Sequence, residues 1–377
     1  MSPPRQASFP PPHPDHARKE RALLVQLNVG RYSKAEAADS LSELEGLADT
    51  AGVDVIGHVT QHRDRPTARL LIGKGKLVDI QLACRQGHAN LVIFDNELSA
   101  VQVNNLDLAL GIKVIDRTEL ILQIFARRAK SSEAQIQVEL AQLEYLVSRI
   151  PVSHKQQRFQ GGIGMRGPGE SPLQLRNAPM RRRIKDLRRK LRKIRDRRRR
   201  TRTRRPWPLV CLVGYTNVGK STLMNAMATA DAHVDDRLFA TLDTKTRLVR
   251  AGNGVEFLLT DTVGFIRNLP HGLVASFRST LEEVTQADLL LVVADAGHPR
   301  LDDHLQIVDD TLAEIDAQDV PAMLVLNKCD TPGAREQAAA VRSAHPEAVP
   351  ISARRKEGLD VLKERIARAL HSGNTDR

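Results

Sequence analysis

Aromatic side chains and cysteines are both scarce in this sequence of 377 residues. Only 3% of the residues are Phe, Trp or Tyr, and none of these lies between residues 181 and 205, where the chain is most basic. Single-stranded nucleic acid is therefore a disfavoured ligand, because its bases need aromatic platforms on which to stack. The three cysteines, Cys84, Cys211 and Cys329, lack metal-ligand spacing, and their odd number argues against a disulfide framework.

Long apolar runs are also missing. No run approaches the roughly 18 residues that span a bilayer, and residues 1–20 are rich in proline instead of apolar core formers. We interpret residues 1–20 as a disordered tail. We expect no stable membrane insertion, a reducing compartment and a cytoplasmic location.

Positive charge is concentrated in one segment of the chain. The formal net charge is +12, but residues 181–205 contain 17 Lys and Arg against Asp186 and Asp196, so the remainder is slightly negative. A solvated charged face is the ordinary interpretation of such a run. Because nearly all of these charges have one sign, self-repulsion favours an anionic partner instead, and contact with the phosphates of structured RNA is the favoured mode.

The pattern of apolar residues predicts an α/β protein of three parts. Strand and helix patterns alternate over residues 21–130, which predicts a small N-terminal parallel α/β domain. Residues 131–205 predict an antiparallel, coiled-coil-like helical hairpin, whose two helices, 131–149 and 180–204, are joined through a loop with five glycines in residues 161–170. Pro206 and Pro208 end the second helix, so a P-loop domain is expected over residues 206–371, followed by a tail over residues 372–377. The apolar stripes that would join the two helices are Ile136, Leu140, Leu143 and Val147 on the first and Met180, Ile184, Leu187, Leu191 and Ile194 on the second.

The strongest motif runs from Leu209 to Thr222 and reads LVCLVGYTNVGKST. Five apolar residues predict a buried strand, and the G-x-x-x-x-G-K-S that follows opens a helical segment, as a P-loop requires. Gly214 and Gly219 permit backbone conformations in which successive N–H groups surround a polyphosphate. Lys220 is expected to reach the β- and γ-phosphates, and the Ser221 hydroxyl is expected to bind Mg²⁺.

Two further motifs follow in the order typical of a GTPase. Asp261-Thr262-Val263-Gly264 ends an apolar strand, so Asp261 is expected to hold Mg²⁺ and the Gly264 N–H to meet the γ-phosphate. Thr241, in the FATLD stretch, is predicted to be the switch threonine that senses γ-phosphate and Mg²⁺. Phe265 occupies the place where Ras-like GTPases carry a water-orienting Gln, so slow unaided hydrolysis is expected.

The last motif selects the base. Asn327-Lys328-Cys329-Asp330 follows another apolar strand, and the Asp330 carboxylate can accept hydrogen bonds from N1–H and the 2-amino group of guanine. Adenine offers no such pair of donors, so GTP is predicted as substrate and GDP as product in preference to ATP. Ser352-Ala353, after a short strand, is assigned by its position to the loop whose backbone N–H meets guanine O6.

These motifs define the candidate site. The predicted catalytic residues are Lys220, Thr241 and Gly264, and the predicted metal ligands are Ser221, Thr241 and Asp261. The predicted nucleotide-binding residues are Gly214, Tyr215, Thr216, Asn217, Val218, Gly219, Lys220, Ser221, Thr222, Phe239, Ala240, Thr241, Asp261, Thr262, Val263, Gly264, Asn327, Lys328, Asp330, Ser352 and Ala353.

Taken together, the motifs resemble the HflX family of ribosome-associated GTPases over residues 21–370. The glycine-rich loop is the most family-specific piece, and the chain departs from the family pattern directly after it, at Ser171–Pro179. The resemblance is carried by IGKGK (Ile72–Lys76), VIDRTELILQIFARRA (Val114–Ala129), QVELAQL (Gln137–Leu143), GGIGMRGPGE (Gly161–Glu170), GYTNVGKST (Gly214–Thr222), FATLD (Phe239–Asp243) and DTVGFIRNLP (Asp261–Pro270).

The resemblance implies a monomeric GTPase that binds the large (50S) ribosomal subunit and its rRNA. It further implies that the protein splits or rescues stalled 70S ribosomes, with GTP hydrolysis gating its release and the hairpin reaching toward the peptidyl transferase region. Two alternatives remain at this point. One is an ATP-driven RNA-remodelling protein that holds a second nucleotide through Lys74 and Lys76, and the other is a non-catalytic RNA-binding module.

Overall fold

A computed structural model describes residues 19–30, 33–149, 172–202, 206–228, 238–239, 242–251, 254–267 and 283–372, with the side chains of the basic helix described from 178 to 197. The chain forms two compact units, Met1–Leu120 and Ile121–Arg377. None of the helices within these ranges is long and apolar enough to cross a membrane. Each unit is described by itself below.

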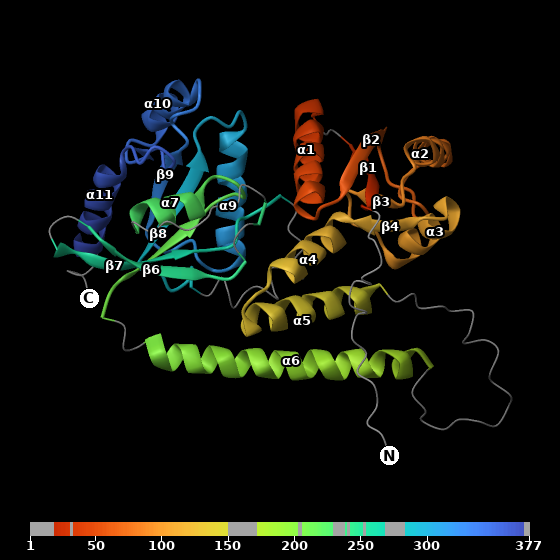
Figure 1. Ribbon diagram of the computed structural model, residues 1–377, viewed down its shortest axis with the longest axis horizontal. Coiled ribbons are helices and arrows are strands. Elements are labelled where there is room, and N and C mark those ends of the chain that lie inside the picture. Colours follow the sequence, from red (N-terminus) through yellow and green to blue (C-terminus); the bar gives the residue numbers. More distant parts are fainter. Residues whose placement is uncertain are drawn as a thin grey trace, which may run out of the picture. The chain divides into compact units, whose positions relative to one another are not determined.

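The first unit is a four-stranded parallel sheet with the strand order β2-β1-β3-β4. Helix α1 covers one face and helices α2 and α3 cover the other (Figure 1). Alternate residues of a strand point to opposite faces of its sheet. In β1, Leu23, Val25 and Leu27 point to one face and pack in the same apolar cluster as residues of α2 and α3. Its elements are β1 (Arg21–Val29), α1 (Lys34–Thr50), β2 (Asp54–Arg63), α2 (Lys74–Gly87), β3 (Leu91–Phe94), α3 (Ala100–Leu110), β4 (Lys113–Asp116) and the start of α4 (Arg117–Arg128).

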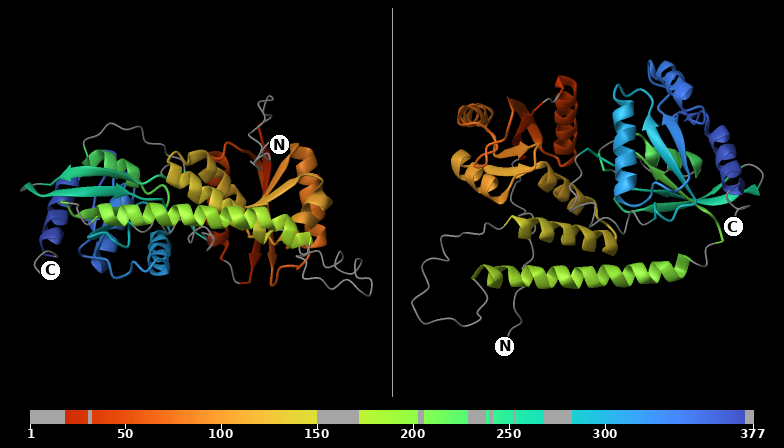
Figure 2. Two further views of the ribbon diagram at one scale, coloured as in Figure 1. Left: turned by 90° about the horizontal axis from the view of Figure 1, so that it is seen from below. Right: turned by 180° about the vertical axis from the view of Figure 1, so that it is seen from behind.

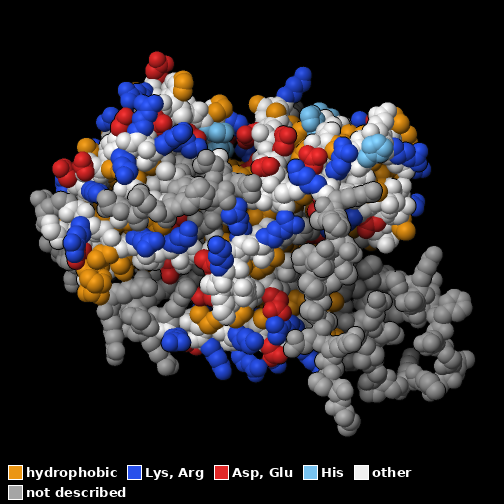
Figure 3. Space-filling view, in the orientation of Figure 1, with side chains coloured by type: hydrophobic (Ala, Val, Ile, Leu, Met, Phe, Trp, Pro, Cys, Tyr) orange, Lys and Arg blue, Asp and Glu red, His pale blue; other side chains and the backbone are white. Residues whose placement is uncertain are grey.

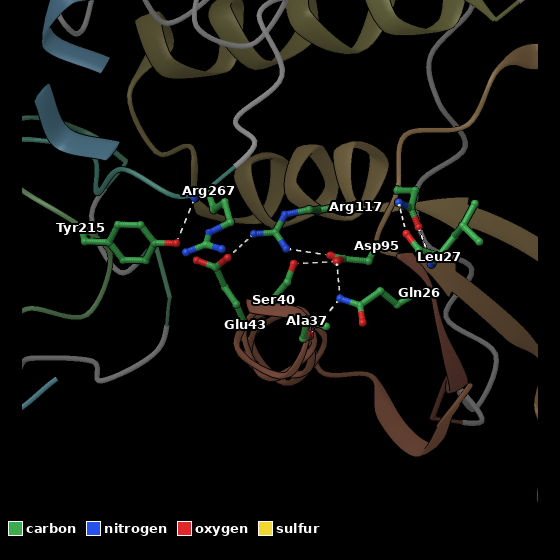
Figure 4. Close-up of polar contacts among 10 residues, drawn as sticks. Gln26, Leu27, Ala37, Ser40, Glu43, Asp95, Arg117, Tyr215 and Arg267 are labelled. Atoms are coloured by element: carbon green, nitrogen blue, oxygen red, sulfur yellow. Dashed lines mark hydrogen bonds and ion pairs between the residues drawn. The ribbon is translucent and has the colours of Figure 1, made fainter. Parts of the chain in front are cut away.

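A buried ionic network ties this unit together at the carboxyl ends of its strands (Figure 4). The Arg117 guanidinium donates to Asp95, at 2.8 Å, and to Glu43 on α1. Asp95 also accepts hydrogen bonds from Ser40 at 2.6 Å and from Gln26 at 3.1 Å. Burial acts to lower the pKa of Arg117, but the two carboxylates outweigh it and raise that pKa above its usual value. The network therefore fixes α1 and α4 to the end of β3.

The predicted helical hairpin is confirmed. Helices α5 (Ser132–Ser148) and α6 (Pro172–Arg202) run antiparallel and side by side (Figure 1), and Figure 2 shows α6 along its full length. Leu140 packs with Leu187 and Leu191 in the seam. Two ion pairs flank the seam: Arg183 donates to both oxygens of Glu139 at 2.6 and 2.8 Å, and Arg188 donates to Glu144 at 2.8 Å.

Helix α6 begins earlier than predicted. The expected start near Met180 is wrong, because α6 begins at Pro172 and includes Pro179. A proline at the first position needs no N–H partner, so Pro172 is compatible with a helix start. Pro179 removes one internal hydrogen bond, a local loss that the rest of a 31-residue helix accommodates. The glycine-rich loop Gly161–Glu170 lies outside the described residues.

The rest of the second unit is a P-loop domain built on a six-stranded sheet. The strand order is β10-β9-β8-β5-β7-β6, parallel except for β6, which pairs antiparallel with β7. Helices α7 and α11 pack in one apolar cluster and α9 in another, on opposite faces of the sheet (Figures 1 and 2). Its elements are β5 (Leu209–Val213), α7 (Lys220–Met227), β6 (Lys245–Arg250), β7 (Glu256–Asp261), β8 (Leu289–Asp295), α9 (Leu301–Glu314), β9 (Ala322–Asn327), α10 (Ala334–Ala344), β10 (Val349–Pro350) and α11 (Leu359–Ser372).

Strand β5 sits in the middle of this sheet, between β8 and β7. All five of its residues are buried, as the apolar run LVCLV predicts for a strand covered on both faces. The carboxyl ends of β5, β7 and β9 therefore meet at one edge, where the three predicted motifs emerge.

Candidate functional site

The loop between β5 and α7 has the backbone that a P-loop needs. A Cβ on Gly214, whose φ is +146°, would lie 2.2 Å from the Val293 carbonyl oxygen. A Cβ on Gly219, whose φ is +92°, would lie 2.4 Å from Asn327 Nδ2. Both positions therefore require glycine for φ and for space. The loop leads directly into α7, whose N-terminus favours negative charge.

Lys220 is the first residue of α7 and its side chain turns back into the loop. Its ammonium group donates to the carbonyl oxygens of Gly214 at 2.9 Å and Tyr215 at 2.7 Å. Burial lowers the pKa of this lysine to about 8, although the nearby Asp261 carboxylate opposes the shift. A buried ammonium at the N-terminus of a helix is suited to binding an anion such as phosphate.

Ser221 and Asp261, two of the three predicted metal ligands, are brought together. The Ser221 hydroxyl donates to Asp261 Oδ2 at 2.6 Å, and the Asp261 residue is fully buried at the end of β7. The next residue, Thr262, donates its hydroxyl to the Leu212 carbonyl oxygen at 2.6 Å and so fixes the end of β7 to β5. A hydroxyl and a carboxylate in contact are hard oxygen donors, which fit Mg²⁺.

The segment after β7 lies directly against the P-loop. The Thr216 N–H donates to the Phe265 carbonyl oxygen at 2.8 Å, and the Phe265 N–H donates to the Gly214 carbonyl oxygen at 3.0 Å. A Cβ on Gly264 would lie 2.9 Å from Thr216 Cα and Cγ2 and 3.0 Å from Lys220 Nζ. Gly264 therefore lies directly against Thr216 and Lys220, and only a residue without a side chain fits there without displacing them.

Tyr215 supports this contact through its side chain. Its hydroxyl accepts a hydrogen bond from the Arg267 N–H at 3.0 Å (Figure 4). Its ring stacks on His304 of α9, with the ring centroids 3.9 Å apart and the planes 4° from parallel. The ring of His298 also stacks on His304, with the ring centroids 4.1 Å apart. The sequence assigned Tyr215 to the P-loop only through its backbone, so these aromatic contacts were not predicted.

The guanine-recognition motif is organised by hydrogen bonds to its neighbours. The Asn327 amide donates to the Val218 carbonyl oxygen at 2.8 Å and accepts from the Ala353 N–H at 2.9 Å. Asn327 thus connects the P-loop with the loop assigned to guanine O6. Lys328 forms an ion pair with Asp295 at 2.8 Å, a partner at the end of β8 that the motif did not reveal.

Asp330 is held in its ionised form. The Ser352 hydroxyl donates to Asp330 Oδ1 at 2.7 Å and is the main reason that the pKa of this carboxyl lies below its usual value. Arg355, at 3.8 Å from Asp330 Oδ2, acts in the same direction. An ionised carboxylate is the acceptor that the two guanine donors require.

The predicted switch segment is described only in part. Ala240 and Thr241 lie outside the described residues. Phe239, on one side of them, is buried, has φ +54° and makes an edge-to-face contact with Phe125 of α4 at 4.7 Å. On the other side, Asp243 contacts the start of α5, a role that its place in the FATLD stretch did not predict.

The remaining predicted positions are placed in the same loop and strand ends. Asn217 adopts φ +60° within the P-loop, Val218 is buried, Thr222 lies in the first turn of α7, and Val263 is buried between Thr262 and Gly264. The Ser352 N–H donates to the Glu357 carbonyl oxygen at 3.1 Å.

Lys74 opens helix α2 and Lys76 pairs with Asp79 at 3.0 Å, as expected of a helix-starting turn.

The fold and this arrangement define a P-loop GTPase. Three family models match the chain: GTP-binding GTPase N-terminal over residues 38–126, GTP-binding GTPase Middle Region over 128–205 and 50S ribosome-binding GTPase over 209–328. The chain belongs to the HflX family of GTPases. The non-catalytic alternative is therefore wrong, because this family hydrolyses GTP.

Two curated relatives and one solved structure illustrate the similarity. The chain is 46% identical to GTPase HflX of Caldanaerobacter subterraneus, over 93% of this chain and 81% of the relative. It is 42% identical to GTPase HflX of Escherichia coli, over 82% of this chain and 73% of the relative. The crystal structure of the SsGBP and GDP complex matches with a TM-score of 0.53 and 26% identity, over 94% of this chain and 99% of that one.

Proposed function

We propose that the protein binds the large (50S) ribosomal subunit through rRNA, separates stalled 70S ribosomes when it carries GTP, and leaves after hydrolysis. It acts as a monomer in the cytoplasm. The helical hairpin binds the rRNA, and GTP hydrolysis in the P-loop domain determines when the protein leaves the ribosome. The family model that matches residues 209–328, which is described as a 50S ribosome-binding GTPase, supports this function.

The observation that carries the proposal is the charge on α6. The seam with α5 buries Leu187 and Leu191, so most of the Lys and Arg between 181 and 197 are exposed. Figure 3 shows Lys and Arg side chains gathered over α6. A rigid helix with one sign of charge and no aromatic residue is suited to contacting phosphates in a double-stranded or compact RNA.

The contact between Asp243 and α5 supports a role for GTP in positioning the hairpin. Asp243 follows Thr241 by two residues and accepts hydrogen bonds from the N–H groups of Lys130 at 3.0 Å and Ser131 at 3.2 Å. A bound γ-phosphate that draws Thr241 toward the site would therefore also move Asp243, which holds the first turn of α5.

Mg²⁺ would be held by Ser221 and Asp261, with Thr241 as a further ligand. It would neutralise charge that develops on the β- and γ-phosphate oxygens. Lys220 and the backbone N–H groups of the P-loop would bind the phosphates, and Gly264 would donate its N–H to the γ-phosphate. Asp330 would select guanine.

Sucrose-gradient sedimentation of purified 70S ribosomes tests the function. The protein is added with GTP, with a non-hydrolysable GTP analogue or with GDP. We expect separated subunits, with the protein on the large subunit, in the presence of the analogue and intact 70S ribosomes with GDP. Equal profiles with the analogue and with GDP would contradict the proposal.

A charge-matched pair of variants tests the binding element. In the first, four exposed residues of α6 become Gln, and in the second, four exposed residues of the N-terminal unit do, so the net charge changes equally. We expect only the first to lose large-subunit binding and to show a shallower dependence of binding on salt, while both retain GTP affinity. The two sets are Arg182, Lys190, Arg192 and Lys193, and Arg65, Arg69, Arg85 and Lys113.

A further inference from the structure

The known reaction needs a polar group that Phe265, the residue after Gly264, does not supply. Phe265 follows Gly264, and its ring is buried in the apolar cluster with Cys211, Val213 and Val284. A buried hydrocarbon ring can neither accept a hydrogen bond from water nor donate one. A group that orients the attacking water must therefore come from elsewhere.

The buried Thr216 hydroxyl has no hydrogen-bond partner among the described residues. Thr216 as a whole is 7% exposed. Its hydroxyl oxygen, Oγ1, is fully buried. Two other hydroxyls of the site do have partners: Ser221 donates to Asp261, and Thr262 donates to Leu212, both at 2.6 Å. A buried hydroxyl without a partner is unfavourable, so such groups in a folded protein call for an explanation.

Thr216 lies against Gly264 and close to Lys220 Nζ. Its Cα and Cγ2 lie 2.9 Å, and Lys220 Nζ 3.0 Å, from the point where Gly264 would carry a Cβ. Lys220 and the Gly264 N–H are the two groups expected to hold the γ-phosphate. Because Thr216 donates its own N–H to Phe265, its backbone is fixed in this position.

We propose that the Thr216 hydroxyl is a catalytic group that orients the attacking water. It accepts a hydrogen bond from the water and donates its own hydrogen to a γ-phosphoryl oxygen. The water oxygen forms the new bond to γ-phosphorus, and the bond to the bridging oxygen breaks, with its electron pair leaving on GDP. The proton of the water passes to the phosphate that is released. This role rests on the proposed nucleotide site, not on the ribosome function.

Thr216→Val tests the role, because valine keeps the shape of threonine and removes only the hydroxyl. We expect single-turnover GTP hydrolysis to slow about 10- to 100-fold, the effect of one hydrogen bond to a charged group. Affinities for GTP and GDP should stay within about twofold. Thr216→Ser, which restores the hydroxyl, should recover most of the rate. Thr311→Val, on α9 and outside the site, is the matched control.

The melting temperature separates catalysis from packing. Because the Thr216 hydroxyl has no partner in the described structure, Thr216→Val should melt at the same temperature as the unchanged protein or higher. An unchanged hydrolysis rate in Thr216→Val would overturn the proposal. Equal losses of rate and of GTP affinity would also overturn it, by assigning Thr216 to binding. Thr216→Ala, read in the same assays, replaces the valine variant if that variant does not fold. Subunit separation with the non-hydrolysable analogue should survive in Thr216→Val, so failure of the ribosome function is recognised separately.

Discussion

Asp243 and Ser131 are 112 residues apart in the sequence, yet the Asp243 carboxylate accepts hydrogen bonds from both the N–H and the hydroxyl of Ser131. Ser131 is itself the N-cap of α5, and its hydroxyl accepts from the Ala134 N–H at 3.1 Å. The carboxylate thus lies at the end of the helix where negative charge is favoured. The start of α5 is stabilised by a residue from the predicted switch segment.

Replacing Asp243 should loosen the first turn of α5. We expect Asp243→Ala to lose about 1 kcal/mol of local stability, as for other N-terminal contacts of this kind, so that amide exchange in this turn becomes about fivefold faster. Hydrogen exchange of a peptide that covers residues 130–135 measures this effect. Asp64→Ala, an exposed carboxylate of the N-terminal unit, serves as control. Unchanged exchange in Asp243→Ala would mean that the contact contributes nothing to α5.

Asp330→Asn should weaken guanine binding. The variant replaces an ionised acceptor of two hydrogen bonds with a group that presents a donor to the base, at a cost of about 2–4 kcal/mol. Fluorescence titration with GDP and with xanthosine diphosphate measures the change. Xanthine carries an oxygen acceptor where guanine carries an amino group, so the variant should bind xanthosine diphosphate better than the unchanged protein does. Equal GDP affinities would refute the assignment of Asp330.

Gly264→Ala should distinguish GTP from GDP. The added methyl group would overlap Thr216 and Lys220, so the segment after β7 must move away from the P-loop. We expect GTP affinity to fall about 10- to 100-fold, through loss of a hydrogen bond to the charged γ-phosphate, while GDP affinity stays nearly unchanged. Gly75→Ala, at a position with no atom within 4 Å of the added Cβ, is the control. A parallel loss of GTP and GDP affinity would contradict the γ-phosphate contact.

The pKa of Lys220 predicts a pH dependence of nucleotide binding. Burial lowers this pKa to about 8, whereas an unfolded lysine titrates near about 10.4. Between these values the unfolded chain holds one more proton at this position, so the free-energy cost of burying this lysine decreases as the pH rises. Phosphate binding needs the charged form, so the affinity for GDP should fall above about pH 8. Lys220→Met should bind more weakly and lose this dependence. The same pH profile in both proteins would contradict the prediction.

The parts of the site that are encoded by short contiguous motifs were predicted from the sequence. The strand Leu209–Val213 was predicted with the observed bounds, because a short apolar run next to a P-loop has one interpretation. Strand β6 was not predicted. Four of its six residues are Lys, Thr or Arg at the sheet edge, and five are exposed, so no alternation of apolar side chains reveals it.

Contacts between distant residues were beyond the reach of the sequence. The stacking of Tyr215 on His304 and the ion pair of Lys328 with Asp295 each join different elements of the fold. A motif specifies the backbone conformation and the residue types at fixed spacing. The partners of these side chains follow only from how the sheet brings strand ends and helices together.

The length of the hairpin determines how large a displacement at its far end results from a small rotation of the P-loop domain. At 1.5 Å per residue, the 31 residues of α6 extend for about 46 Å. A rotation of about 5° at the joint between Asp243 and Ser131, transmitted along helices held together by the Leu187 and Leu191 seam, would displace the far end by about 4 Å. Hydrogen bonds form over a spread of donor–acceptor distances of only about 0.5 Å, so a displacement of about 4 Å is enough to make or break contacts with a rigid RNA surface.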